Sequence, residues 1–134
     1  MTSHPAQRVL IVGAGAVGQV YGRHLQLGGA EVTFLVKPHH VEGLEAPLRL
    51  YPLNQCALGD EPVEFSDYTL ITEPPKATDR PFDQVWLCVS SPAIRHPWLE
   101  ELCKAIGDAT VVTLLPGIED RALLLEYIPE ERLV

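Results

Sequence analysis

Apolar residues gather in short continuous runs along this chain, and segments with apolar residues at helical spacing lie between them. Four runs predict strands: residues 8–12, 31–36, 85–89 and 110–115. Three segments predict helices: residues 14–27, 92–106 and 120–127. In the first helix the residues at helical spacing are Val17, Val20, Tyr21, His24 and Leu25, and Gly28-Gly29 follows as a stop. Strands that alternate with helices predict an α/β fold, an open parallel sheet with helices on both faces.

The stretch between the second and third of these strands is less regular. Residues 38–45 predict a short helical turn, and residues 73–81 are rich in proline and charge, which indicates a surface loop. Short strands, arranged as hairpins beside the main sheet, are predicted at Val63, Phe65 and residues 68–72. Residues 1–7 and 129–134 carry neither pattern, so we expect loose ends around one domain of 134 residues.

The first strand runs directly into a glycine-rich turn, Gly13-x-Gly15-x-x-Gly18, that opens the first helix. Gly13 permits the tight turn, Gly15 lets a pyrophosphate approach the backbone, and Gly18 lets the helix pack closely on the strand. The positive end of the helix favours phosphate. The motif predicts a Rossmann-type dinucleotide site at Gly13, Ala14, Gly15, Ala16, Val17 and Gly18. Flavin and S-adenosylmethionine domains use similar turns, and some such turns bind no nucleotide.

The residue that ends the second strand of such a fold faces the ribose of adenosine. An acidic residue there binds the ribose hydroxyls and selects NAD, whereas this chain has Lys37. An ammonium can neutralise a 2′-phosphate, and His39 and His40 are close enough in sequence to assist it. We therefore predict NADP(H) as the cofactor; the alternative is a solvated lysine at the end of a strand.

Charge and cysteine content narrow the range of partners and compartments. The net charge of −8 argues against nucleic acid and anionic membranes, because nothing would offset phosphate repulsion. The chain shows no signal-peptide pattern and no run of membrane-spanning length, so we expect a cytoplasmic location. The spacing of Cys56, Cys88 and Cys103 predicts neither a disulfide framework nor a zinc site. His39 and His40 lack a suitably spaced third ligand, so no metal site is predicted.

Three blocks of the sequence resemble the N-terminal domain of the ketopantoate reductases (2-dehydropantoate 2-reductases), and they cover nearly the whole chain. They are G-A-G-A-V-G-x-x-Y-G-x-x-L with G-G-A-E-V-T-F-L-V-K in residues 13–37, F-D-Q-V-W-L-C-V in 82–89 and T-L-L-P-G-I-E-D in 113–120. The resemblance implies NADPH as cofactor, with Lys37 where the family usually has arginine. It also implies that Val89 and Ser90 lie beside the cofactor.

The chain departs from the family pattern at two positions. Ser90 stands where the family has a lysine near the nicotinamide, and Pro116 stands where it has an asparagine that touches cofactor and substrate. The resemblance also implies a C-terminal helical domain, which carries the lysine general acid and is absent from residues 1–134. We therefore expect residues 1–134 to form the dinucleotide-binding domain alone, and we assign no catalytic residue. The family's last strand is absent too, which predicts an open sheet edge where a homo-oligomer could pair.

The leading functional prediction is an NADP(H)-binding domain of a ketopantoate-reductase-like oxidoreductase. In the complete enzyme a hydride would pass to a 2-keto acid, a small-molecule substrate. We expect this chain alone to be inactive. The alternative, which Ser90 and Pro116 favour, is a catalytically degenerate nucleotide-binding or interaction module.

Overall fold

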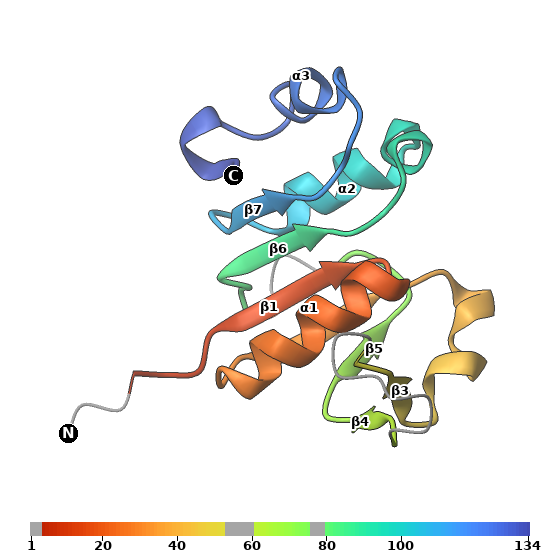
Figure 1. The fold of residues 1–134 in the computed structure, drawn as a ribbon. Coiled ribbons are helices and arrows are strands. Elements are labelled where there is room, and N and C mark those ends of the chain that lie inside the picture. Colours follow the sequence, from red (N-terminus) through yellow and green to blue (C-terminus); the bar gives the residue numbers. More distant parts are fainter. Residues whose placement is uncertain (1–3, 53–60, 76–79) are drawn as a thin grey trace.

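A five-stranded parallel sheet forms the centre of the part of the chain that the structure describes (Figure 1). The structure is a computed structural model, and it describes residues 4–52, 61–75 and 80–134. The order β5-β2-β1-β6-β7 joins strands β1 (Arg8–Val12), β2 (Glu31–Leu35), β5 (Thr69–Ile71), β6 (Gln84–Leu87) and β7 (Thr110–Thr113). All neighbouring pairs are parallel. The predicted α/β fold with an open parallel sheet is confirmed.

Each face of the sheet carries its own apolar core. Alternate residues of β1 point to opposite faces, so Val9 and Ile11 belong to one core, and Leu10 and Val12 belong to the other. Helix α1 packs on the first face and lies in front of the sheet in Figure 1. Helices α2 and α3 contribute to the second core through Leu99, Leu102 and Leu124. The bounds are α1 (Ala16–Leu27), α2 (Trp98–Ala105) and α3 (Asp120–Leu124).

Proline divides the segment that was predicted as one helix over residues 92–106. A 3₁₀ turn, η4 (Ser91–Arg95), comes first, and α2 starts at Trp98. Between them His96 is extended, with φ −110° and ψ 156°. A residue before proline is pushed out of the helical region by the proline ring, and Pro97 follows His96. Other 3₁₀ turns in the described residues are η1 (Pro38–His40), η2 (Glu42–Leu44) and η5 (Glu130–Arg132).

The hairpin prediction holds for only part of residues 48–72. Strands β3 (Leu48–Leu50) and β4 (Val63–Phe65) pair antiparallel in a separate small sheet. Residues 68–72 were predicted to lie beside the main sheet, but β5 joins it, in parallel with β2. The amide of Val36 also donates to the carbonyl of Ile71 at 3.0 Å, which extends this pairing. Sequence pattern identified the strand, whereas its partner depended on distant residues.

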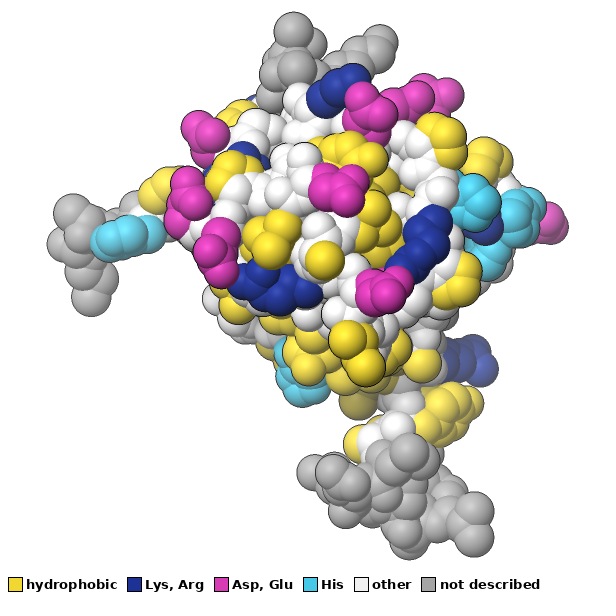
Figure 2. Space-filling model, turned by 90° about the horizontal axis from the view of Figure 1, so that it is seen from above, with side chains coloured by type: hydrophobic (Ala, Val, Ile, Leu, Met, Phe, Trp, Pro, Cys, Tyr) yellow, Lys and Arg dark blue, Asp and Glu magenta, His cyan; other side chains and the backbone are white. Residues whose placement is uncertain are grey.

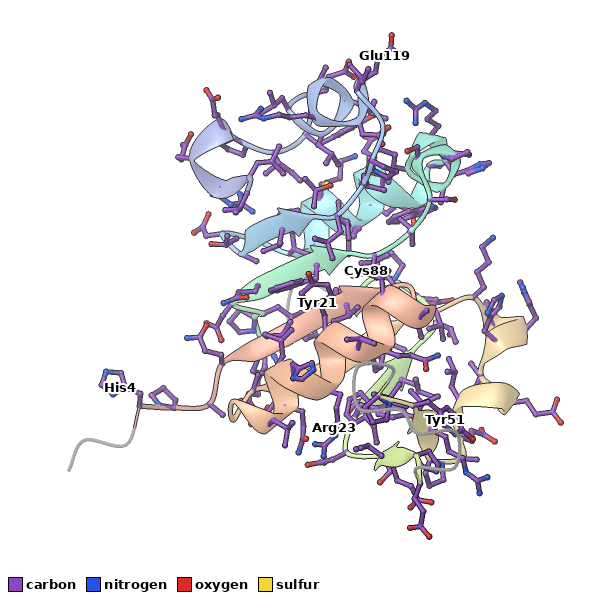
Figure 3. The ribbon with its side chains drawn as sticks, in the orientation of Figure 1. His4, Tyr21, Arg23, Tyr51, Cys88 and Glu119 are labelled. Atoms are coloured by element: carbon purple, nitrogen blue, oxygen red, sulfur yellow. The ribbon has the colours of Figure 1, made fainter. Side chains whose placement is uncertain are left out.

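Of the apolar side chains that recur at helical spacing on helix α1, only Leu25 packs against the core of the sheet. Val17, Val20 and Tyr21 are 52%, 45% and 40% exposed, whereas Gly18 and Gly22 are buried. A Cβ built on Gly22 would lie 2.8 Å from Cζ of Phe34. The two glycines therefore let the helix backbone approach the sheet closely, and the apolar side chains flank this contact. Figure 3 shows Tyr21 on the exposed side of α1 facing β6, where its ring packs on Trp86 with centroids 5.1 Å apart.

The last residues of the chain are bound to the sheet, which corrects the prediction of a loose end and of a fully open edge. Leu133 forms a parallel bridge with Val111. The amide of Val134 donates to the carbonyl of Val111, and the amide of Thr113 donates to the carbonyl of Val134, each at 2.8 Å. The edge of β7 is therefore occupied along these residues. None of the helices in the described ranges is long and apolar enough to span a membrane.

Candidate dinucleotide-binding site

A cavity of about 430 Å³ opens at the carboxyl ends of β1, β2 and β6. In open parallel sheets ligands bind at this end, where the strand order reverses on either side of β1. Six of the predicted site residues line it: Gly13, Ala14, Gly15, Lys37, Val89 and Ser90. The other three, Ala16, Val17 and Gly18, form the first turn of α1 and do not line it. Further lining residues were not predicted, among them Thr72, Pro74, Ala93 and Trp98.

The three motif glycines meet different neighbours. Gly13 has φ +93°, and a Cβ there would lie 2.6 Å from the carbonyl oxygen of Cys88. A Cβ on Gly18 would clash with the carbonyl oxygen of Gly13. A Cβ on Gly15 would meet nothing within 4 Å, and its φ of −75° is open to any residue. Gly13 and Gly18 are therefore required by the fold, whereas the space in front of Gly15 is open to a ligand.

The N-terminus of α1 supports an anion site at the same place. Gly15 is the N-cap and supplies no side-chain hydrogen bond, and the first turn holds no acidic residue. The first amides of a helix have no partner inside it, and the helix dipole makes this end positive. Because the void at Gly15 lies in front of these amides, the residues present fit the pyrophosphate of a dinucleotide.

The end of the cavity that follows β2 is basic. Lys37 directly follows the last buried residue of the second strand segment, Val36, and no ion pair among the described residues involves it. No Asp or Glu is among the described residues that line this cavity, so the ammonium has no competing carboxylate there. Thr72 and Pro74, which follow β5, complete this part of the lining.

The other end of the cavity is formed after β6. Ser90 is exposed and caps η4, with extended backbone angles of −76° and 155°. Trp98 lines the cavity and is fixed by its indole N–H, which donates to the carbonyl of Ala93 at 2.8 Å. Trp98 also packs against the apolar core on this face of the sheet, so the same side chain belongs to the core and to the cavity wall.

A buried carboxylate joins the loops that follow β6 and β7. Asp120 has a side chain that is 3% exposed and accepts from the Ser91 hydroxyl at 2.5 Å, the Gly117 amide at 2.9 Å and Arg95 at 3.1 Å. The Ser91 hydrogen bond first, then those from Arg95 and Gly117, hold the pKa of Asp120 below its ordinary value against the effect of burial. Ser91 and Asp120 also line a second cavity of about 540 Å³. Asp120 thus joins the turn that follows β6 to the residues that follow β7.

The cysteines and histidines in the described ranges do not form a metal-binding cluster. Burial raises the pKa of Cys88 and of Cys103 to about 11, so both thiols stay protonated at neutral pH. Both are free, and Cys56 lies outside the described residues. Within the described ranges no group of three or more His, Cys, Asp or Glu side chains could hold a metal ion. Figure 2 shows basic side chains separated by acidic, apolar and neutral ones on the face it presents, not joined in a basic surface.

Nucleotide-binding α/β domains combine a parallel sheet with a glycine turn that leaves space at the start of a helix. This protein has that architecture in the Rossmann-type form. A sequence model described as "Ketopantoate reductase PanE/ApbA" matches residues 9–134, and the chain belongs to this family of oxidoreductases. No curated protein matches the chain.

Solved structures of longer proteins share the fold. The 2-dehydropantoate 2-reductase from Geobacter metallireducens GS-15 is 25% identical, with a TM-score of 0.75, over 94% of this chain and 39% of that one. D-mandelate dehydrogenase with NADH and anilino(oxo)acetate is 22% identical, with a TM-score of 0.71, over 95% and 39%. The Methylococcus capsulatus 2-dehydropantoate 2-reductase is 18% identical, with a TM-score of 0.62, over 90% and 38%. This chain spans about two fifths of these proteins.

Proposed function

We propose that this chain binds NADP(H) as the nucleotide-binding domain of a ketopantoate-reductase-like oxidoreductase. The observation that carries the proposal is the pairing of two features in one cavity. The uncapped glycine turn around Gly15 suits a pyrophosphate, and Lys37 supplies an unpaired ammonium with no carboxylate among the described lining residues. A 2′-phosphate favours this environment, whereas the ribose hydroxyls of NAD(H) call for an acidic acceptor.

The reaction proposed for the complete enzyme is reduction of a 2-keto acid. The nicotinamide, when bound, supplies the hydride, and the protein supplies position and electrostatics. Two relatives named 2-dehydropantoate 2-reductase and one crystallised with anilino(oxo)acetate support a small keto-acid substrate. In this chain the turn at Gly15 would orient the cofactor, and Val89, Ser90 and Trp98 would enclose its reactive end. We place the protein in the cytoplasm, with residues 1–134 as the cofactor half.

The test is calorimetric titration of the purified chain with NADPH and with NADH at low salt. We expect tighter binding of NADPH, and Lys37→Asp should weaken it by roughly ten- to a hundredfold, since hydrogen bonds to charged groups contribute about 1.5–3 kcal/mol. Lys104→Asp is the control, because it changes the net charge equally on α2, outside the cavity. Equal affinity of the native chain for the two cofactors would refute the NADP(H) assignment. The alternative is NADH as cofactor, since the structure of D-mandelate dehydrogenase, a similar protein, contains NADH.

A second candidate function is a nucleotide-binding or interaction module without catalysis. Ser90 and Pro116 favour it, because neither can supply the cation and the amide that the family is expected to place there. The two functions differ in turnover. The assay uses the longest natural form of the gene product and follows the loss of NADPH absorbance with ketopantoate and other 2-keto acids. Oxidation of NADPH that depends on the protein would support the enzymatic function and exclude a module without catalysis.

A further inference from the structure

The turn after β2 has a basic residue at each of its ends. Lys37 precedes Pro38 and is extended, with φ −68° and ψ 146°, as the proline ring requires. The amide of His40 donates to the carbonyl of Lys37 at 2.9 Å, which closes one 3₁₀ turn. Lys37 and His40 are therefore the two ends of this turn, and His39 lies between them in sequence.

The cavity lining distinguishes the two histidines. Lys37 and His40 both line the dinucleotide cavity, and His39 does not. The ring of His39 packs on that of His40, with centroids 4.3 Å apart and planes inclined by 58°. No ion pair among the described residues includes either histidine. His40 thus lies in the cavity lining together with Lys37, and its ring is in contact with that of His39.

We propose that His40 is the second ligand of the 2′-phosphate of NADP(H) and that His39 is not a ligand. This inference rests on the proposed function. Lysine is a flexible point charge that attracts an anion without fixing its direction. An imidazole N–H is a directed donor on a ring with few rotatable bonds, so it fixes one phosphate oxygen. The two residues would therefore divide the task, Lys37 supplying charge and His40 supplying orientation.

The test compares His40→Phe with His39→Phe, because phenylalanine keeps an aromatic ring in place and removes the nitrogen donors. NADPH and NADH are titrated into each purified variant by calorimetry, with adenosine 2′,5′-bisphosphate and ADP as smaller probes. We expect His40→Phe to weaken NADPH and the 2′,5′-bisphosphate by roughly tenfold, with NADH and ADP unchanged within about twofold. His39→Phe should leave all four ligands unchanged. His40→Arg should restore the preference for NADPH, because guanidinium also donates to phosphate.

Each alternative role of His40 has its own result. Equal weakening of NADPH and NADH by His40→Phe would mean that the ring contacts the base or the pyrophosphate, and this would overturn the inference. An unchanged NADPH affinity in His40→Phe, or an equal effect of His39→Phe, would overturn it as well. Thermal melts of both variants control for unfolding. If the native chain binds neither cofactor, the proposed function fails and this inference fails with it, whereas the other outcomes leave the proposed function intact.

Discussion

Substitution of Gly15 separates ligand binding from folding in the glycine turn. Gly15→Val adds a branched side chain at a position where an added Cβ would meet nothing within 4 Å. The φ of −75° at this position is one that valine adopts freely. The fold should therefore accept it. Valine is a poorer N-cap than glycine, so we expect the free energy of unfolding to fall by no more than about 1 kcal/mol.

The same side chain should exclude the pyrophosphate. An overpacked contact costs about 1–3 kcal/mol, and this corresponds to a roughly five- to 150-fold loss of affinity. The assay is calorimetric titration with NADPH, beside urea unfolding of the same preparation. Gly43→Val is the matched control, because a Cβ at Gly43 also meets nothing within 4 Å and Gly43 does not line the cavity. Native NADPH affinity in Gly15→Val would place the phosphates elsewhere and refute the assignment.

Two further predictions concern stability. Gly22→Ala should lower the free energy of unfolding, measured by urea titration, by about 1–3 kcal/mol, because its Cβ would lie 2.8 Å from Cζ of the buried Phe34. A more stable variant would show that α1 is not held close to the sheet by this glycine. Asp120→Asn should be less stable than the native chain at pH 7. The pKa of Asp120 is lowered in the folded state, so its contribution is present above 3.8 and fades as pH falls through the lower folded value. The measurement is urea unfolding of the native chain and of Asp120→Asn at decreasing pH. If the difference in their free energies of unfolding does not shrink in acid, this explanation is wrong.

Much of the fold follows from the sequence because it depends on near neighbours. The first strand, the glycine turn and the first helix are consecutive, and their apolar runs and glycines determine their local conformations. The positive φ of Gly13 and the close approach at Gly18 match the roles that the motif assigns to them. Lys37 is also located by chain position, since it follows a strand whose end the pattern defines.

Contacts between distant segments were decided only in three dimensions. The apolar spacing of α1 identified a helix but did not mark its buried face, because the closest packing goes through Gly18 and Gly22, which approach Ile11 of β1. Residues 69–71 looked like part of a hairpin, yet they pair with β2 some thirty-five residues earlier in the chain. Asp120 looked like the start of a helix, and its partners Ser91 and Arg95 come from another loop.

The site shows the same division between local and long-range information. The sequence position of His39 and His40 could not separate their roles, because both follow Lys37 within the same short segment. The cavity lining separates them, since it includes His40 and leaves out His39. Thr72, which follows β5, and Trp98, at the start of α2, also line the cavity, although both are far from the glycine turn in sequence. Local pattern thus determined which residues make the turn, and the pairing of distant strands decided which other side chains surround it.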